Sequence, residues 1–211
     1  MALDRELFEE FVQNPAAFPL LRVYQVTPPG VTVGRSSRKE KIGTVLFSDE
    51  KNKNRPYFCI RPTGGGRVQH GNDLIYSVMA RRDSFPTFHQ VRTSYLSFHE
   101  AVQEALQEIG VQTRLFRCDE AKRPGRKKFW LERGSGDCFE EPVATDVLAD
   151  EKKIAGGGQW RRREGFLHQG SIQIPEGQSF ETLKKALQGA FQRKFSIVWQ
   201  DSPSWVAKNP S

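Results

Sequence analysis

The chain has 211 residues and a formal net charge of +7, and 37% of its residues are hydrophobic, including 15 Phe and 4 Trp, which is enough to build a core and excludes a wholly disordered chain. Its apolar runs are only a few residues long and the segment Met1–Glu10 is acidic, which excludes a transmembrane helix and a signal or transit peptide. The three cysteines are scattered, which excludes a disulfide framework and a CxxC metal clip, so we expect one reduced, cytoplasmic domain over residues 1–211.

The first half of the chain predicts one helix followed by short strands. Leu3–Val12 carries apolar side chains on one helical stripe and acidic side chains opposite it, and Pro15 ends the pattern. Strand-like segments follow, separated by polar loops and turn signals such as Pro28-Pro29-Gly30. We expect strands at Leu20–Val26, at Val31–Gly34, within Lys39–Phe47, and at Tyr57–Arg61 and Leu74–Ala80 on either side of a glycine-rich turn.

The second half predicts two further helices with strands between them. Ser97 and Glu100 form a capping box that predicts a helix start, and Gly110 supplies a stop. Ser179–Phe195 again repeats apolar residues at helical spacing. We expect strands at Val111–Phe116, Pro142–Leu148, Lys152–Gly158, Gln159–Arg163 and Phe166–Ile174. Strands joined by tight turns, with the helices grouped, indicate an α+β domain on a mixed, largely antiparallel sheet flanked by helices.

Two glycine-rich segments are candidate sites. The first runs from Arg61 to His70 and contains Gly64, Gly65 and Gly66, which let a ligand come close to backbone N–H groups. It lacks the Lys-Ser/Thr of a Walker A loop, and a flexible hairpin turn is an equal alternative. The second places Lys152 and Lys153 before a run that begins at Gly156, where an ammonium beside backbone donors would form an oxyanion or phosphate clamp. Its alternative is a surface lysine at the end of a hairpin.

Three further features carry possible chemistry. Cys138 lies in a Gly- and Ser-rich loop before a strand, whereas Cys59 and Cys118 suit buried hydrophobic positions. A free thiol has a pKa near ~8.5, so Cys138 needs a nearby cation to be a thiolate at neutral pH. His168 lies in an alternating strand, and a lone histidine there is more often packed or on the surface than catalytic. The run Arg161–Arg163 is a solvated strand edge unless an acidic partner docks there.

Taken together and in this order, the segments resemble the superfamily of lipoate–protein ligase, octanoyltransferase and biotin-ligase catalytic domains. The motifs are MALD at Met1, LRVYQVTPPGVTVGR at Leu21, RPTGGGRVQH at Arg61, NDLIYSV at Asn72, CFEEPVATDV at Cys138, KKIAGGGQWRRR at Lys152 and LHQGSI at Leu167. The resemblance runs from Met1 to about Ile174. It implies a sheet and helix arrangement related to class II aminoacyl-tRNA synthetase cores.

The resemblance also implies roles for the candidate residues. The acyl pocket would be lined by Arg61, Gly64, Gly65, Gly66, His70 and Gly156. Lys153 would contact the acyl carbonyl or acyl-phosphate, with Lys152 pointing outward. The Cys-Phe-x-x-Pro pattern at Cys138 is similar to that of octanoyltransferases with a cysteine nucleophile, and the segment after Ile174 is too short for the accessory domain usual in ligases.

For catalysis, the resemblance implies that an octanoyl (or lipoyl) group passes from an acyl carrier protein to Cys138 as a thioester, and then to the acceptor lysine of a lipoyl domain. Lys153 would stabilise the Cys138 thiolate, and Lys153 or His168 would accept the proton that the amine loses. Backbone N–H groups of both glycine segments would hold the oxyanion. The acceptors would be 2-oxoacid dehydrogenase subunits and the glycine cleavage H protein.

The octanoyl chain needs an apolar slot, because about seven buried carbons at ~0.8 kcal/mol each provide its binding energy. We expect this slot under the first glycine segment, lined by Ile60, Tyr76 and Val78.

The sequence departs from the family pattern at three places. The strand usual before MALD is absent, so the start codon is miscalled or the strand is lost. Arg67 places a bulky cation where a small residue is common, and Gly157-Gly158 replaces a more usual Ser-Ala pair, which we expect to loosen the lysine segment.

Alternative functions follow from the same motifs. A lipoate–protein ligase would use ATP and Mg²⁺ at this pocket, whereas a transferase requires no cofactor or metal. A lipoyl amidotransferase would use Cys138 but would take its acyl group from another lipoyl protein. A nucleic-acid binder, suggested by the positive charge, lacks interleaved aromatic residues, so we expect neither a nucleic-acid nor a membrane partner. We instead expect acidic carrier proteins to dock at Arg81-Arg82, Arg117–Arg133 and Arg161–Arg163.

Overall fold

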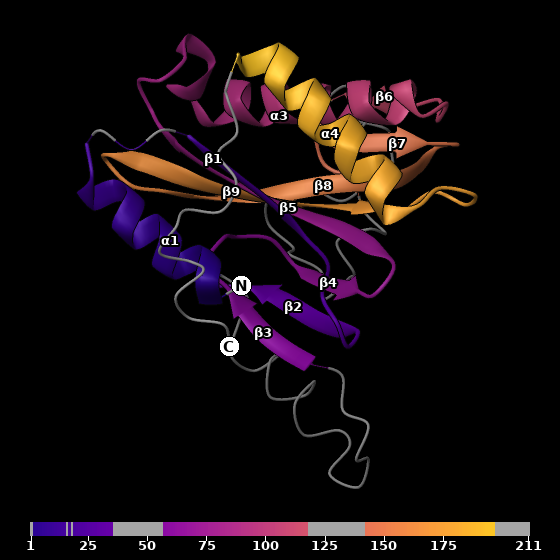
Figure 1. Ribbon diagram of the computed structural model, residues 1–211, viewed down its shortest axis with the longest axis horizontal. Helices are drawn as coiled ribbons and strands as arrows, with labels where there is room; N and C mark the ends of the chain where they lie inside the picture. Colours follow the sequence, from indigo (N-terminus) through magenta and orange to yellow (C-terminus); the bar gives the residue numbers. More distant parts are fainter. Residues whose placement is uncertain (1, 16, 18, 36–56, 118–141, 197–211) are drawn as a thin grey trace, which may run out of the picture.

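A computed structural model describes residues 2–15, 17, 19–35, 57–117 and 142–196 (Figure 1). The helices are α1 (Ala2–Gln13), α3 (Val91–Glu108) and α4 (Phe180–Phe195), with a 3-10 turn, η1 (Pro86–Phe88). The strands are β1 (Leu20–Tyr24), β2 (Gly30–Gly34), β3 (Tyr57–Arg61), β4 (Arg67–His70), β5 (Asp73–Arg81), β6 (Arg114–Leu115), β7 (Val147–Ala149), β8 (Lys152–Arg161) and β9 (Gly165–Gln173). None of the described helices combines the length and apolar character needed to cross a membrane.

The strands form two sheets. The large sheet has six strands in the order β1-β5-β9-β8-β7-β6, and every neighbouring pair is antiparallel. The small sheet has three strands in the order β3-β2-β4, in which β2 is parallel to β3 and antiparallel to β4. The predicted α+β class with mixed, largely antiparallel strands is therefore confirmed, with the strands divided between two sheets.

The two faces of the large sheet are covered by different elements (Figure 1). Helices α3 and α4 pack on one face, and α1 and the small sheet lie on the other. Alternation along β5 separates the side chains: Tyr76 and Val78 join the core under α3 and α4, whereas Met79 joins a second cluster with Leu7 and Phe8 of α1. A shift of one residue along a strand therefore moves a side chain from the helix layer to the small-sheet side.

Aromatic side chains fill much of the core between the large sheet and the two helices. Phe88 and Phe98 are completely buried, with ring centroids 5.2 Å apart. Phe166 of β9 lies edge-on to Phe88, also at 5.2 Å, and Phe195 of α4 lies 5.3 Å from Phe98. Such offset and edge-on pairs add stability beyond the burial of their area. The large sheet thus has a rigid support on the side away from the small sheet.

The predicted start of the central helix was wrong. Helix α3 begins at Val91 instead of Ser97, and Ser97 is buried inside the helix. The helix start is stabilised by local bonds instead: the hydroxyl of Thr93 donates to the carbonyl of Thr87 at 2.6 Å, and that of Ser94 donates to the carbonyl of Val91 at 2.8 Å. A Ser-x-x-Glu pattern also occurs within helices, so here it did not mark the start of the helix. The predicted stop was confirmed, because Gly110 follows the helix with a φ of 85°.

The strand predictions need two corrections. Strand β4 was missed, because the segment after the first glycines was predicted to continue as a turn. The second glycine run lies inside one continuous strand, β8, where two strands, Lys152–Gly158 and Gln159–Arg163, were predicted. Gly157 and Gly158 are paired with Gly170 and Gln169 of β9, so they do not form the loosened segment that was expected. The strand predicted within Lys39–Phe47 lies outside the described residues.

Candidate active site

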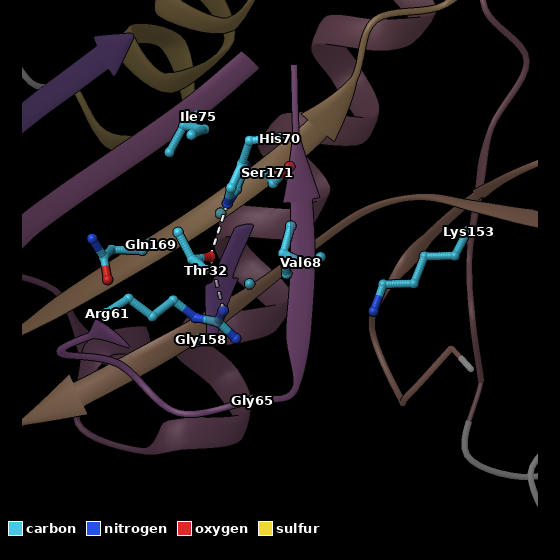
Figure 2. Close-up of a pocket in the computed structure, with 13 residues that line it drawn as sticks. Thr32, Arg61, Gly65, Val68, His70, Ile75, Lys153, Gly158, Gln169 and Ser171 are labelled. Carbon is cyan, nitrogen blue, oxygen red and sulfur yellow. Dashed lines mark hydrogen bonds between the residues drawn. The ribbon is translucent and has the colours of Figure 1, made fainter. Parts of the chain in front are cut away.

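The small sheet and the facing side of the large sheet enclose a cavity of about 480 Å³, including its solvent-open part (Figure 2). The cavity is lined by Thr32, Arg61, Gly65, Val68, His70, Ile75, Lys153, Gly156, Gly157, Gly158, Gln169, Gly170 and Ser171. The structure therefore brings Arg61, Gly65, His70, Lys153 and Gly156 to one place, whereas Gly64, Gly66 and His168 are not among the lining residues.

Arg61 fixes the first glycine segment. Its Nε and Nη2 donate to the carbonyl of Gly64 at 3.3 and 3.0 Å, and Nη2 also donates to the carbonyl of Gly66 at 2.9 Å. The residue is only 7% exposed, so these bonds form away from most solvent. The segment is a held loop rather than a flexible turn, and the guanidinium is the group that holds it.

Two other glycines allow this loop to come close to the neighbouring strands. A Cβ on Gly34 of β2 would lie 2.3 Å from the carbonyl oxygen of Gly65, and a Cβ on Gly158 of β8 would lie 2.7 Å from that of Gly64. Both distances are too short for any side chain, and the atoms approached are backbone atoms. Gly65 itself has a φ of 101°, which favours glycine. The loop is thus enclosed between the two sheets.

His70 is part of a buried hydrogen-bond chain. Its Nδ1 lies 2.6 Å from Oδ2 of Asp73, and its Nε2 lies 2.8 Å from the hydroxyl oxygen of Thr32. The hydroxyl of Ser171 donates to the same Asp73 oxygen at 2.6 Å, and Nη1 of Arg61 donates to Thr32 at 3.1 Å. Burial acts to raise the pKa of Asp73, but the hydrogen bonds from His70, Ser171 and the Gly71 N–H lower it below its usual value. Asp73 is therefore an ionised carboxylate.

Lys153 forms a buried ion pair at the edge of the cavity. Its Nζ is 2.8 Å from Oδ2 of Asp146, and the two side chains are 7% and 2% exposed. The same carboxylate oxygen accepts the N–H of Val143 at 2.7 Å. A Cβ on Gly156 would lie 2.6 Å from Cε and 2.9 Å from Nζ of Lys153, so the missing side chain of Gly156 makes room for the pair. Lys152 is exposed, as expected.

Gln169 links the cavity to a buried carboxylate in α1. Its Nε2 donates to Oδ2 of Asp4 at 2.6 Å, and its Oε1 accepts the hydroxyl of Thr63 at 2.9 Å. Asp4 is fully buried and also accepts the hydroxyls of Tyr24 and Ser77 at 2.6 and 2.7 Å. Burial and the adjacent Asp4 raise the pKa of Tyr24 well above its usual value, which keeps its proton on the phenol. The MALD segment thus reaches the glycine loop through Gln169.

His168 does not reach the cavity. It is fully buried on the helix side of the sheet, with Nε2 3.2 Å from the hydroxyl of Tyr76 and Nδ1 3.2 Å from Nε2 of Gln159. Burial lowers the pKa of His168 well below its usual value, so the ring is neutral. A Cβ on Gly157 would lie 2.7 Å from its Nε2, which puts the ring directly behind the strand backbone that lines the cavity. The expected place of His168 among the cavity residues is not supported.

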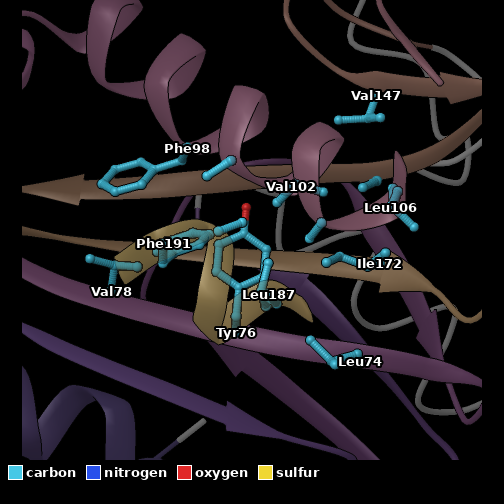
Figure 3. Packing of buried hydrophobic residues seen from close by; sticks show 14 of the residues in the cluster. Leu74, Tyr76, Val78, Phe98, Val102, Leu106, Val147, Ile172, Leu187 and Phe191 are labelled. Carbon is cyan, nitrogen blue, oxygen red and sulfur yellow. The ribbon is translucent and has the colours of Figure 1, made fainter. Parts of the chain in front are cut away.

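The predicted lining of the acyl slot was wrong by one residue along β5. Tyr76 and Val78 belong to the core under α3 and α4 (Figure 3), and Ile60 is 47% exposed. The apolar side chains that line the cavity are Ile75 and Val68. Arg67, expected to reshape the slot, is exposed and is not among the lining residues.

Several residues that line the cavity or bond to its lining were not singled out from the sequence. These are Thr32, Asp73, Asp146, Gln169 and Ser171. Strand alternation offered a signal for two of them, since a His168 side chain on the helix side places residues 169 and 171 on the cavity side. Asp73 and Asp146 lie inside the motifs NDLIYSV and CFEEPVATDV. These motifs were used to recognise the family, and no role was predicted for either aspartate.

Cys138 and Cys118 lie outside the described residues. Among the described residues the free cysteine is Cys59, which is partly exposed. The described ranges contain no group of three or more His, Cys, Asp and Glu side chains that could hold a metal ion.

The predicted docking run Arg161–Arg163 does not form one surface. Arg161 bonds the carbonyl of Phe88 and the hydroxyl of Ser94, and it packs 4.7 Å from the ring of Phe166. Arg162 instead pairs with Glu9 of α1 at 2.9 Å. The two side chains point to opposite faces of the sheet, where Arg161 contacts η1 and α3 and Arg162 contacts α1, and Arg163 is exposed.

Comparison with known proteins agrees with this geometry. Residues 1–201 match the family model for the lipoyl protein ligase A/B catalytic domain. The chain belongs to this family. Relatives include octanoyltransferase LipM from Kyrpidia tusciae, 34% identical over 156 residues, or 73% of this chain and 54% of the relative. Octanoyltransferase LipM from Moorella thermoacetica is 30% identical over 173 residues, or 82% of this chain and 59% of the relative. The chain thus spans a little more than half of the length of these relatives.

Solved structures of the lipoyl protein ligase family share the fold. A crystal structure of lipoate-protein ligase A bound with ATP superposes with a TM-score of 0.70 and 21% identity, over 95% of this chain and 81% of that one. The bipartite lipoate protein ligase from Thermoplasma acidophilum, determined with its E2 lipoyl domain, gives a TM-score of 0.67 and 17% identity, over 95% and 80%. The resemblance inferred from the motifs, and the architecture it implied, are confirmed.

Proposed function

We propose that this protein transfers an octanoyl group to the acceptor lysine of a lipoyl domain, through a thioester on Cys138 and without ATP. The observation that carries the proposal is the buried Lys153–Asp146 pair, which lies at a cavity formed by both glycine segments. Relatives named octanoyltransferase LipM support the class of reaction. The remaining parts of the proposal concern the acyl chain, the nucleophile, the oxyanion and the partners.

The acyl chain would lie between Ile75 and Val68, against strand backbone at Gly157 and Gly170 that has no side chains. Burying about seven carbons at ~0.8 kcal/mol each contributes at most ~5–6 kcal/mol. This energy is sufficient for micromolar-range recognition once other contacts are added.

The nucleophile would be Cys138. Its thiolate attacks the carbonyl carbon of the donor thioester, the bond from that carbon to the donor sulfur breaks, and the donor leaves as a thiol. Cys138 precedes Val143 by five positions, so the chain between them spans at most ~18 Å. The N–H of Val143 donates to Asp146, and Asp146 pairs with Lys153, so the Lys153 ammonium lies close to the point where the described chain resumes after Cys138. A cation in that position would favour the thiolate.

The oxyanion would be held by backbone N–H groups of β8. Strand β7 pairs with β8 only as far as Ala155, whereas β9 pairs with β8 as far as Arg161. No described strand pairs with the outer edge of β8 at Gly156–Gly158. Backbone donors at that edge, beside the Lys153 ammonium, would stabilise negative charge on the carbonyl oxygen of the transition state.

The donor would be an octanoyl acyl carrier protein and the acceptors would be lipoyl-domain proteins. The structure of a family member with an E2 lipoyl domain supports the acceptor class. Both kinds of partner are small protein domains that present a flexible, extended arm. Such an arm suits a cavity that is open to solvent on one side.

The test is to follow each half-reaction by intact-protein mass spectrometry. Octanoyl acyl carrier protein should add one octanoyl group to the wild-type enzyme, and an apo lipoyl domain added next should remove it. Cys138→Ala should do neither, whereas the control Cys59→Ala should do both. Octanoate with ATP and Mg²⁺ should give no product. Product in that arm from Cys138→Ala would show a ligase, and use of an octanoylated lipoyl protein in place of the carrier protein would show an amidotransferase.

A further inference from the structure

The last step of the proposed function requires a proton acceptor. A lysine amine has a pKa near ~10.4, so at pH 7 only about one molecule in 2,500 carries the lone pair that attacks a thioester. A group in the cavity must therefore take a proton from the ammonium before or during attack. The identity of this proton acceptor rests on the proposed function.

The two residues first considered for this task are poorly placed. The Lys153 ammonium is held 2.8 Å from the Asp146 carboxylate, and an ammonium cannot accept a proton until it has lost one. His168 is on the far side of the sheet, enclosed by Tyr76, Gln159 and the rings of α3. Neither places a free lone pair in the cavity.

Hydrogen bonds link Arg61 to Asp73 through Thr32 and His70. When the His70 ring carries a single proton, these hydrogen bonds can be donated in only one order. A guanidinium only donates, so the Thr32 oxygen accepts from Arg61. The ionised Asp73 only accepts, so Nδ1 of His70 carries the proton between them. The Nε2 of His70 is then an acceptor, and the hydroxyl hydrogen of Thr32 points to it over 2.8 Å. Thr32 lines the cavity.

We propose that Thr32, His70 and Asp73 form a proton relay for the attacking amine. The substrate ammonium passes a proton to the Thr32 oxygen while the Thr32 hydroxyl proton moves to Nε2 of His70. The neutral amine attacks the thioester carbonyl carbon, and the bond from that carbon to the cysteine sulfur breaks. As the amide forms, its nitrogen passes a second proton to the leaving cysteine thiolate, and His70 releases the first proton through Thr32 to water that enters the cavity, so the relay ends as it began.

The charges around His70 suit this role. Asp73 of β5 contacts one ring nitrogen and stabilises the imidazolium that forms in the middle of the cycle. Arg61 of β3 keeps one lone pair of Thr32 occupied, so the threonine hydroxyl has a fixed orientation toward His70 before the amine arrives. Lys153 is the other described cation lining the cavity, and it is already paired with Asp146. Thr32 and His70 are 1% and 4% exposed, so both members of the relay are shielded from bulk solvent.

The experiment compares two acceptors in the acyl-enzyme step. Wild type, Thr32→Val and Asp73→Asn are first loaded from octanoyl acyl carrier protein, and loading is checked by mass spectrometry. Transfer is then timed to an apo lipoyl domain and, separately, to hydroxylamine, which is neutral at pH 7 and needs no base. We expect both variants to lose about 100-fold or more in transfer to the lysine and to stay within about threefold of wild type with hydroxylamine. Thr32→Ser should restore lysine transfer, because it keeps the hydroxyl.

Each other outcome overturns the relay. Equal losses with both acceptors would show that Thr32 and Asp73 only shape the cavity, and no loss with either would show that the proton goes elsewhere. Gln69→Ala, an exposed change next to His70 on β4, serves as a control and should match wild type. Circular dichroism on each variant separates a folding defect from a kinetic one. Failure of the wild type to load or transfer would instead overturn the proposed function itself.

Discussion

Single side chains in this protein depend on partners that are equally buried. Asp146 is the clearest case, because its carboxylate faces the Lys153 ammonium at 2.8 Å and also binds the N–H of Val143. Removing one member of a buried ion pair leaves the other charge uncompensated in a poorly solvated place. Lys153, the cation of the proposed site, and the fold around it therefore depend on the same contact.

Asp146→Asn should destabilise the protein by about 3 kcal/mol and slow loading of Cys138 from the octanoyl donor. Urea unfolding gives the first quantity and single-turnover mass spectrometry gives the second. Glu151→Gln is the matched control, because Glu151 pairs with Arg114 on the surface, with 76% of its side chain exposed. That change should cost less than about 1 kcal/mol. Similar costs for both changes would contradict the buried-pair interpretation.

Ile75 should set the length of acyl chain that the cavity accepts, because it is one of the two branched apolar side chains lining it. Ile75→Phe places a larger side chain on the cavity wall and shortens the space for the acyl chain. The value of kcat/KM should therefore fall at least tenfold for an octanoyl donor and much less for a butanoyl donor. The conservative control Ile75→Leu should keep the wild-type preference. An unchanged octanoyl-to-butanoyl ratio in Ile75→Phe would place the chain elsewhere.

At the scale of elements, the site depends on close approach between β8 and the glycine loop. Gly158→Ala puts a Cβ 2.7 Å from the carbonyl oxygen of Gly64, and β8 is paired along its length with β9. The loop must therefore move and stretch its bonds to Arg61, which should cost about 1–3 kcal/mol and slow acyl loading. Differential scanning calorimetry and the loading assay measure the two effects.

The same substitution elsewhere should act in the opposite direction. Gly189 lies inside α4, where a Cβ would meet only the flexible end of Arg193 at 3.1 Å. Gly189→Ala should stabilise the protein by about 0.5–1 kcal/mol, because alanine loses less backbone entropy in a helix. If both glycines gave the same sign, the steric account of Gly158 would be wrong.

The elements that could be predicted from the sequence are those with a clear local pattern of apolar spacing or capping residues. Leu7, Phe8 and Phe11 predicted α1, and Ser179 predicted the start of α4, where its hydroxyl accepts the N–H of Thr182 at 3.1 Å. The glycine run of β8 was misjudged, because three glycines indicate a turn unless the neighbouring strand is known. Only the register with β9 shows that Gly157 faces Gly170 across the pair.

The sequence drew attention to the cavity residues of unusual type and missed others. Arg61 and His70 were noted because they bracket a glycine run, and Lys153 was noted because its segment resembles the family motif. Ile75 was missed in favour of Tyr76 because both are buried, at 1% exposure each, and sequence alone does not tell which face of β5 meets the small sheet. Thr32 was missed for the same reason, since its role depends on which strands lie beside β2.

For the whole molecule, two buried histidines should make stability depend on pH. Burial lowers the pKa values of His99 and His168, so in the folded protein both rings stay neutral below the usual value near ~6.5. The unfolded chain takes up these protons first as pH falls, so stability is full above about pH 6.5 and declines below it. Each histidine contributes a slope of up to about 1.4 kcal/mol per pH unit.

Urea unfolding at several values between pH 7.5 and 5.5 measures this slope. His168→Gln should lower the stability at pH 7.5 but should also make the decline shallower, because one of the two proton-linked groups is gone. The exposed His89 provides the control, and His89→Gln should leave the slope as in wild type. A slope that is unchanged in His168→Gln would show that other groups govern the acid sensitivity.

The central position of β9 has a consequence for the order in which the protein can acquire its site. Strand β9 pairs with β5 on one side and β8 on the other, and it supplies Gln169, Gly170 and Ser171 to the cavity wall. During synthesis, β5 leaves the ribosome long before Ser171 is added to the chain. Until then, Asp73 lacks its hydrogen bond from Ser171 and β5 lacks its pairing with β9. A ribosome-bound chain stalled before Gly165 should thus be readily cleaved by protease and should bind no acyl donor, however complete its glycine loop is.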